Sequence, residues 1–393
     1  MVLLIILVLI EILMPVIMRQ HLFSNYRIRY YILLVIHVIL SIWLWFLFFE
    51  VAGYKSFYDD PQHVWMLMNL TGMVAAVVVP RVIIILCHYI GLLIRRSSGG
   101  HIRWLTNTGI ITAAVIFTII ASGTLHGRFN FKTEEVTIKI KGLHPDLDGL
   151  RIVQLSDMHL AGFHHHRKML EKATNRVNEL KPDLILNTGD FVTYGWREYG
   201  RSDTILSKAK SKYGNYAILG NHDFGTYHPF FSEADRDNNV SILNNLVKAS
   251  GYNVLNDENV LVMVGDARLA ISGIITKGSH PDIIYGDLRK AISGTDSADL
   301  KILLSHDPNH WEEQVTGKTD IDITFSGHTH GMQMGIITKG FRWSPSKYIF
   351  PNWNGLYLHG QQVQYVNRGL GVLSIPFRIW MPPEITVITL LKE

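Results

Sequence analysis

Cysteine is nearly absent from this chain, which has a single one, Cys87, among 393 residues. One cysteine cannot form an intramolecular disulfide framework, and it also excludes a metal site built from several thiolates. Charge of one sign is not in large excess either: the formal net charge is +4, so charge gives no reason to expect nucleic-acid binding. Internal repeats, low-complexity segments and long linkers are missing too, so a second soluble domain is not expected.

Hydrophobic residues, in contrast, make up 48% of the chain, and the mean hydropathy is positive. The excess lies in the first 125 residues, while the remainder has the mixed composition of a globular protein. We therefore expect an all-α transmembrane region over residues 1–125 and one soluble domain over residues 131–393. The soluble part is long enough to bury a core without disulfides.

Four stretches of the first part approach or exceed the ~20 apolar residues that cross a bilayer as a helix. A cleaved signal peptide would explain the first alone, and such lengths suit a bilayer better than the core of a small soluble domain. The third stretch contains Pro80 and Arg81, so it is either one kinked span or a span joined to an interfacial piece. The four stretches are Val2–Met18, Tyr31–Phe49, Val64–Ile94 and Leu105–Ala121.

The charges of the connecting loops predict the orientation. Arginine-rich loops stay in the cytoplasm, and the first and third loops are of this kind, with Arg19, Arg27 and Arg29 in one and Arg95, Arg96 and Arg103 in the other. The second loop carries Glu50, Lys55, Asp59 and Asp60. We therefore expect a multi-pass protein of the cell membrane whose termini and soluble domain are extracytoplasmic.

Two charged residues, Glu11 and Arg81, lie within the apolar stretches. Charges are costly in lipid, so both are candidates for a function. We favour a simpler interpretation, in which Glu11 faces a partner inside the helix bundle and Arg81 extends its head group to the membrane surface.

From Phe131 onward one arrangement recurs: a short apolar run is followed at once by Asp, Asn or His. Such runs are typical of buried strands in an α/β sheet, whose sites form beyond the carboxyl ends of the strands. An alternating strand, Val136–Ile140, precedes the runs, and a helix, His166–Leu180, is expected between the first two. The runs are Leu150–Leu155, Leu184–Leu186, Tyr216–Leu219, Leu300–Leu304 and Ile321–Phe325.

Seven side chains at these strand ends are candidate metal ligands. Their carboxylate, imidazole and amide donors suit Mn, Fe, Zn or Co better than a structural zinc. Seven donors are too many for one ion, so we expect two divalent ions bridged by Asp190, which together clamp a phosphoryl group and activate a water. Two of the motifs have i, i+2 spacing, which in an extended turn directs both side chains to one side. The candidates are Asp157, His159, Asp190, Asn221, His306, His328 and His330.

His222 directly follows Asn221 and is expected to point into the site without binding metal. There it would neutralise the phosphate of the substrate or protonate the leaving oxygen, so it is the candidate catalytic residue. A single histidine is more often an ordinary core or surface residue. The recurrence of the pattern at five strand ends is what favours a metal site.

Taken together, these motifs resemble those of the calcineurin-like metallophosphoesterase family. The resemblance extends from Val136 to the C-terminus and implies an α/β domain of four layers, αββα. It implies that Asp157, His159, Asp190 and His330 hold one ion, that Asp190, Asn221, His306 and His328 hold the other, and that Asn221 and His222 contact the substrate. The motifs are Asp157-Met158-His159, Gly189-Asp190, Gly220-Asn221-His222-Asp223, His306 and Gly327-His328-Thr329-His330, in that order.

The end of the chain resembles the membrane-attached branch of that family at Gly355–Tyr357 and Tyr365–Gly371. Met332 departs from the branch, which usually has a glycine there. Arg368 is expected to bind a phosphate of the substrate, with an ordinary salt bridge as the alternative. An aromatic stretch forms either a flap that faces the membrane or an acyl chain, or a loop that packs its own small core. Its aromatic residues are Phe341, Trp343, Tyr348, Phe350, Trp353 and Tyr357.

These features favour metal-dependent hydrolysis of a phosphoester or pyrophosphate at the membrane surface, on a substrate that is a lipid or is linked to one. A nucleotide-sugar lipid pyrophosphatase is an alternative, but it would need a cytoplasmic domain, which the loop charges oppose. A catalytically inactive membrane sensor or scaffold is a second class, opposed by the complete ligand set. A transporter with an accessory domain is a third, and the scarcity of intramembrane charges opposes it.

Overall fold

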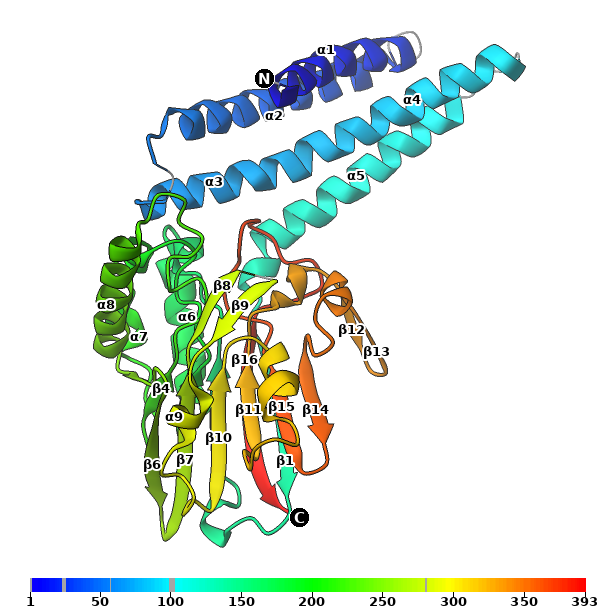
Figure 1. The fold of residues 1–393 in the computed structure, drawn as a ribbon. Helices are drawn as coiled ribbons and strands as arrows, with labels where there is room; N and C mark the ends of the chain where they lie inside the picture. Colours follow the sequence, from blue (N-terminus) through cyan, green and yellow to red (C-terminus); the bar gives the residue numbers. More distant parts are fainter. Residues whose placement is uncertain (1, 23–25, 57, 99–102, 280) are drawn as a thin grey trace. The chain divides into compact units, whose positions relative to one another are not determined.

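The computed structural model describes residues 2–22, 26–56, 58–98, 103–279 and 281–393 (Figure 1). Contacts divide the chain into two compact units, one of apolar helices and one of mixed sheets and helices. Two short segments belong to the unit that their place in the sequence does not suggest. Tyr58–Trp65, between the second and third apolar stretches, clusters with the sheets, and Ser374–Phe377 clusters with the apolar helices.

The helical unit contains four helical segments that are long and apolar enough to cross a membrane: Leu4–His21, Arg27–Gly53, Pro61–Arg95 and Arg103–Phe129. Its contacts pair α1 with α2, α1 with α4, and α4 with α5. The loop of residues 99–102 and the side chain of Arg96, used above for orientation, lie outside the described residues. The elements are α1 (Val2–Leu22), α2 (Arg27–Gly53), α3 (Pro61–Met73), η1 (Val74–Val78), α4 (Val79–Ser98) and α5 (Arg103–Leu125).

The third apolar stretch forms one continuous helix, because α3 passes through η1 directly into α4. The five residues of η1 are π-helical and lie just before Pro80. Proline has no N–H to donate to the preceding turn, and a π-helical turn adjusts the hydrogen bonding there without breaking the helix. The third stretch is therefore one continuous helix, as the interpretation of a single span expects.

Glu11 faces a partner in the helical unit, as expected. Its Oε1 lies 2.6 Å from Nη1 of Arg81, and its Oε2 accepts a hydrogen bond from Ser41. The expectation that Arg81 extends to the membrane surface is wrong: the side chain is buried and also donates to the carbonyl of His37. Pairing offsets the cost of burying each charge within an apolar bundle.

The second unit is built on two six-stranded sheets. One has the order β1-β16-β2-β3-β4-β5, and the other has the order β14-β15-β11-β10-β7-β6, whose strands lie side by side in Figure 1. The strands are β1 (Lys132–Ile140), β2 (Arg151–Leu155), β3 (Leu184–Asn187), β4 (Asn215–Ala217), β5 (Asn253–Val254), β6 (Glu258–Val264), β7 (Ala267–Ile274), β10 (Leu300–Ser305), β11 (Ile323–Ser326), β14 (Gly355–His359), β15 (Gln362–Val366) and β16 (Glu384–Lys392). Two hairpins, β8 (Thr276–Ser279) with β9 (Asp282–Tyr285) and β12 (Ile336–Thr338) with β13 (Phe341–Trp343), stand apart from these sheets.

The strands predicted from apolar runs are present, with small shifts of their ends. The main differences are that β4 ends at Ala217, before Leu219, and that β11 begins at Ile323, after Ile321. The strands β2, β3 and β4 are parallel neighbours, as are β10 and β11. Parallel neighbours in a sheet end at the same edge of that sheet. The turns that follow β2, β3 and β4 therefore lie at one edge of the first sheet, and those that follow β10 and β11 lie at one edge of the second.

Alternating side chains of β2 build two different cores. Ile152 belongs to the core between the sheets, together with Ile302 of β10 and Phe325 of β11. Val153 belongs to the core beneath the helices α6 (Arg167–Glu179) and α8 (Glu233–Ala249), since adjacent residues of a strand point to opposite faces. The short helix α7 (Asp203–Leu206) lies on this side too.

A third core covers the outer face of the second sheet. Leu303 of β10 packs there with Leu288 of α9 (Leu288–Ile292) and with Trp311 of the π-helical segment Trp311–Val315. The unit therefore has the four layers helix, sheet, sheet, helix that the resemblance implied. The predicted helix His166–Leu180 is α6, and its face of Leu170, Ala173 and Val177 is buried as expected.

Candidate metal centre

All seven expected ligands lie in short turns just beyond β2, β3, β4, β10 and β11. Five of them have a positive φ: Asp157 (49°), His159 (41°), Asp190 (57°), His328 (71°) and His330 (50°). The expected reason for the i, i+2 spacing, an extended turn, is therefore wrong. The left-handed conformation costs roughly 1–2 kcal/mol for each residue that has a Cβ atom, and such residues concentrate at functional sites.

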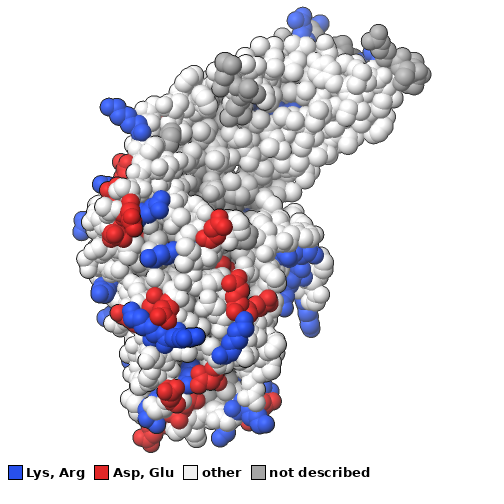
Figure 2. Space-filling model, in the orientation of Figure 1, with Lys and Arg blue, Asp and Glu red and all other residues white. Residues whose placement is uncertain are grey.

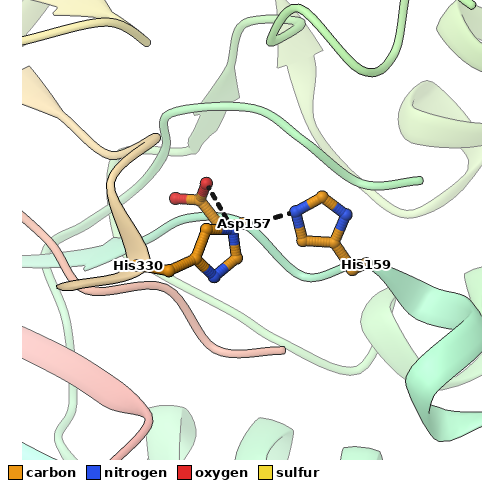
Figure 3. Close-up of side chains that lie close together, drawn as sticks. All are labelled: Asp157, His159 and His330. Carbon is orange, nitrogen blue, oxygen red and sulfur yellow. Dashed lines mark hydrogen bonds and ion pairs between the residues drawn. The ribbon is translucent and has the colours of Figure 1, made fainter. Parts of the chain in front are cut away.

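Asp157, His159 and His330 form the first cluster, with one donor atom of each within 4.8 Å of the others. Figure 3 shows the three side chains converging. Nε2 of His330 lies 3.2 Å from Oδ1 of Asp157 and 3.0 Å from Nε2 of His159. All three residues are buried, although carboxylate and imidazole groups are normally solvated.

Asp190, His306 and His328 form the second cluster, again with donor atoms within 4.8 Å of one another. Oδ2 of Asp190 lies 3.0 Å from Nε2 of His306 and 3.9 Å from Nε2 of His159, so this carboxylate lies between the two clusters. Oδ1 of Asn221 lies 3.1 Å from Nδ1 of His328, which brings the amide oxygen to the second cluster.

Hydrogen bonds to the backbone orient two of the histidines, His306 and His222, and a hydroxyl group orients His159. Nδ1 of His306 donates to the carbonyl of Thr188 (2.7 Å), so its Nε2 faces Asp190. Nδ1 of His222 donates to the carbonyl of Thr193 (2.7 Å), and the hydroxyl of Thr193 pairs with Nδ1 of His159 (3.1 Å). Such outer partners are what orient metal-binding imidazoles.

Two glycines allow the turns after β3 and β4 to approach each other. A Cβ atom on Gly189, whose φ is 97°, would lie 2.3 Å from the backbone nitrogen of Gly220. A Cβ atom on Gly220 would lie 2.2 Å from Oδ1 of Asp190. The Gly-Asp and Gly-Asn motifs therefore require glycine, because any side chain at Gly189 or Gly220 would collide with the turn that carries the other proposed ligand.

Two buried carboxylates that the sequence analysis did not assign hold the ligand turns in place. Asp223 accepts hydrogen bonds from the backbone N–H groups of Asp190 (2.9 Å) and Val192 (3.1 Å), and Glu198 accepts one from Thr193 (2.9 Å). Burial and the nearby Asp190 raise the pKa of Asp223 well above its usual value, and burial raises that of Glu198 to about 7. Asp223 is within the Gly-Asn-His-Asp motif, so a signal existed for it, whereas nothing in the sequence distinguished Glu198.

The clusters strongly perturb the acidity of their members. Burial by itself would raise the pKa of Asp157 and of Asp190, but neighbouring histidines outweigh it and hold both far below the usual value. Asp190 in turn outweighs the effect of burial on His306 and raises its pKa to about 10. The site thus holds two carboxylates ionised in a buried setting, which is the electrostatic requirement for binding a cation.

His222 lies beside the clusters without belonging to either. Its ring is 5.1 Å from that of His159 and stacks on Tyr227 at 4.0 Å. The hydroxyl of Tyr227 accepts a hydrogen bond from Nδ2 of Asn221 (3.0 Å), which helps to turn the amide oxygen towards His328. Tyr227 was not singled out from the sequence.

Arg368 does not make the phosphate-binding arrangement that was expected. It is buried, its Nε lies 3.0 Å from Oε2 of Glu384, and its Nη2 lies 2.7 Å from Oε1 of Glu134. The salt-bridge alternative describes it. A different arginine reaches the centre: Arg378 is buried, and its Nη2 lies 3.4 Å from Nδ1 of His330.

The residues present fit divalent metal ions. Nε2 of His306 is buried and makes no aligned hydrogen bond, although it lies 3.0 Å from Asp190. In the other cluster, Nε2 of His159 and Nε2 of His330 face each other at 3.0 Å, and Oδ1 of Asp157 lies 3.2 Å from Nε2 of His330. A cation at each of these points would satisfy the facing donors, and nitrogen and oxygen donors suit the transition metals considered above.

The calcineurin-like phosphoesterase family matches residues 150–332, which include the turns described here. The uncharacterized metallophosphoesterase YkuE of Bacillus subtilis is 31% identical over 266 residues, which cover 66% of this chain and 85% of that protein. The chain belongs to this family and is a phosphoric ester hydrolase of the kind that uses divalent metals.

Two further relatives bear on the membrane and on the substrate. A transmembrane protein with metallophosphoesterase domain of Danio rerio is 29% identical over 71% of this chain and 62% of that protein, so the chain spans about three fifths of that relative. The UDP-2,3-diacylglucosamine pyrophosphatase LpxG of Chlamydia muridarum is 26% identical over 72% of this chain and 96% of that protein. The apolar helices and the transmembrane relative assign this chain to a membrane.

Proposed function

We propose that the chain hydrolyses a phosphoester or pyrophosphate bond of a lipid or lipid-linked substrate at a dinuclear metal centre. The observation that carries the proposal is the position of Asp190, whose Oδ2 lies 3.0 Å from His306 of one cluster and 3.9 Å from His159 of the other. A carboxylate shared between two donor sets is what a two-metal site needs.

Each side chain has a proposed role in this site. Asp157, His159, Asp190 and His330 hold one ion, and Asp190, Asn221, His306 and His328 hold the other. Two such ions, when bound, supply a water of lowered pKa and positive charge that stabilises the phosphoryl oxygens. His222, oriented by the carbonyl of Thr193, directs its Nε2 to the substrate and donates a proton to the leaving oxygen.

Attachment to the membrane favours a substrate that resides there. Arginine-rich first and third loops support an extracytoplasmic domain. Tyr58–Trp65 of the second loop clusters with the sheet unit. This supports an even number of spans between the second loop and the soluble domain, because the two are then on the same side of the membrane. A cysteine introduced at Asp282 in a Cys87→Ser chain should react with a membrane-impermeant maleimide in intact cells; protection until the cells are lysed would reverse this orientation.

A nucleotide-sugar lipid pyrophosphatase is a second candidate, because the pyrophosphatase LpxG aligns over 96% of its length. That activity would release a nucleoside monophosphate from a nucleotide diphosphate sugar that carries acyl chains. It requires a domain that meets a cytoplasmic nucleotide, so the maleimide experiment also separates the two candidates.

The proposal is tested on the purified full chain, stripped with a chelator and reloaded separately with Mn²⁺, Fe²⁺, Zn²⁺ or Co²⁺. Substrates are an aryl phosphate, a bis-aryl phosphate, lipid phosphates and an acylated nucleotide sugar. We expect turnover to require metal and to fall by at least ~10²-fold in Asp190→Asn. The matched control is Asp296→Asn, which alters an exposed carboxylate. Normal turnover by Asp190→Asn would exclude the two-metal mechanism.

A further inference from the structure

The hairpin of β12 and β13 exposes an apolar face. Its two strands pair Ile336 with Trp343 and Thr338 with Phe341, so these residues share one face. The opposite face packs inward, because Ile337 contacts the small core of Phe350, Trp353 and Met381. On the outer face Phe341 is 55% exposed and Ile336 is 42% exposed. A two-stranded hairpin with an uncovered apolar face is only marginally stable in water.

The loop that follows β13 continues this surface. Tyr348 is 73% exposed and Ile349 is 41% exposed. Of the other four aromatic residues of the stretch, Phe350 and Trp353 are buried, and Trp343 and Tyr357 are half-buried. The stretch therefore divides into a small core, which one of the two alternatives drawn from the sequence expects, and an exposed outer surface. We call the outer surface, residues 336–349, the basic-aromatic hairpin.

The charges of this surface have one sign. Between Asp322 and Glu384 the chain has no acidic residue, whereas the basic-aromatic hairpin carries Lys339, Arg342 and Lys347, all exposed. Figure 2 shows acidic and basic side chains intermixed over the lower part of the sheet unit. A positive, acid-free surface with exposed aromatic rings matches an anionic lipid surface, where rings enter the interface and cations meet phosphates.

The base of the hairpin leads directly to chain that belongs with the apolar helices. Met334 forms a β-bridge with Ile379, and the N–H of Ile379 donates to the carbonyl of Gln333 (2.8 Å). Just before Ile379, the segment Ser374–Phe377 clusters with the helical unit, where Thr71 donates to the carbonyl of Ser374 (2.6 Å). Trp380, just after it, is 65% exposed. Only Arg378 separates Ile379, which bridges to the hairpin base, from this segment of the helical unit.

The same hairpin is joined to the turn that carries two proposed ligands. The hydroxyl of Ser344 donates to the carbonyl of Gly331 (2.6 Å), and that of Ser346 donates to the carbonyl of Thr329 (3.3 Å). The ring of Phe350 packs edge-on against His328 at 5.3 Å. These contacts hold the hairpin against the turn after β11, which carries His328 and His330.

We propose that the basic-aromatic hairpin docks on the anionic headgroup layer of the bilayer that anchors this chain. Phe341, Tyr348 and Ile336 enter the interface, and Lys339 and Lys347 lie against lipid phosphates; Arg342 is on the inward face with Ile337 and donates to the carbonyl of Asn354 (3.2 Å). Docking would bring the His328 side of the centre to the level of the headgroups, where a lipid-linked phosphate is presented. This last consequence rests on the proposed function; the docking itself does not.

The test uses the full chain with Cys87→Ser, so that one introduced cysteine carries a nitroxide label. Phe341→Cys is compared with Met263→Cys, which labels an equally exposed apolar position (53%) on β6. The protein is placed in nanodiscs of phosphatidylcholine, with or without phosphatidylglycerol. Power saturation measures collisions of the label with oxygen, which is enriched in lipid, and with a nickel chelate, which is confined to water.

We expect the label at 341 to favour oxygen in the anionic discs and the label at 263 to favour nickel in both. Replacing Lys339 and Lys347 with glutamine should weaken the docked state by roughly fivefold per cation, and salt should act in the same direction. A label at 341 as water-exposed as that at 263 would overturn the proposal. A label shielded from both reagents would overturn it in favour of a protein partner or a second copy. Because the readout is independent of turnover, neither outcome affects the proposed hydrolysis.

Discussion

His228 and Asp59 lie 169 positions apart in the sequence and form a hydrogen bond of 3.2 Å. Nδ1 of His228 accepts from the N–H of Phe230 (3.3 Å), so Nε2 carries the proton and donates to the carboxylate. The ring is buried and stacks on Phe231 at 3.6 Å. The linker before α3 is thereby joined to the loop that follows Asn221 and His222.

A second contact joins the linker to the same site. Tyr58 packs edge-on against Tyr194, with ring centres 4.6 Å apart. Tyr194 follows Thr193, whose carbonyl orients His222. Part of the wall beside the proposed catalytic histidine therefore comes from chain that the sequence assigns to the membrane region.

We expect Asp59→Ala to lower kcat by roughly three- to tenfold while leaving the metal content unchanged. The reason is that a hydrogen bond of this kind contributes about 0.5–1.5 kcal/mol, and its loss frees the loop beside His222. Asp59→Asn keeps an acceptor for Nε2 and should retain most of the activity. A fragment that begins at Phe131 lacks both contacts and should be less active than the full chain. Equal kcat for fragment and full chain would contradict the role given to the linker.

His222→Asn should retain both metals and lose turnover by ~10²–10⁴-fold, because a proton donor is removed and no ligand is. The loss should be greatest for substrates with poorly acidic leaving groups, which depend most on protonation. The measurement is kcat for a series of aryl phosphates, together with the metal content of each variant. His359→Asn, at an exposed position, is the matched control. A uniform loss across the series would show that His222 does not protonate the leaving oxygen.

The strands and the ligand residues could be predicted from the sequence because both follow local rules. Leu184–Leu186 followed by Gly189-Asp190 is apolar enough to identify a buried strand, and the polar residues mark where it ends. The conformation of the turns could not be predicted. Asp157, His159 and Asp190 adopt a left-handed backbone that their own preferences oppose, and only the surrounding tertiary contacts hold them there.

The long-range contacts were equally inaccessible to the sequence. Arg368 was expected at the phosphate, yet it forms a buried ion pair with Glu384 and a second ion pair with Glu134, which is 234 positions away in the sequence. Arg378 has no motif around it, and only the fold brings it to His330. An ion pair between two separate segments leaves no periodic pattern in the sequence, whereas strands and helices leave a periodic pattern of apolar residues.

Met332 offers a direct test of backbone strain. The family resemblance leads us to expect glycine at this position, and the φ of 45° and ψ of 27° of Met332 are left-handed. Met332→Gly should relieve roughly 1–2 kcal/mol of strain, less the greater chain entropy of glycine when unfolded, for a net gain of up to about 1 kcal/mol. Thermal unfolding of the full chain checks this. Met332→Ala keeps the Cβ atom, so it should give no gain; an equal gain in both variants would mean that the side chain, and not the backbone, was unfavourable.

His310 should make the stability of the sheet unit depend on pH. Burial lowers its pKa to about 4, and its Nδ1 pairs with the hydroxyl of Ser305 at 2.9 Å. The unfolded chain takes up this proton near pH 6.5, so between these values the unfolded state binds more protons and stability falls as pH falls. The contribution is fully present above pH 6.5 and amounts to about 1–3 kcal/mol. His310→Gln removes one of the titrating groups and should lessen the pH dependence of the thermal unfolding midpoint between pH 4 and pH 6.5, whereas His359→Gln should not. Chelator-stripped protein must be used, because protonation of the proposed ligands would release metal over the same range. An unchanged pH slope in His310→Gln would mean that another buried group is responsible.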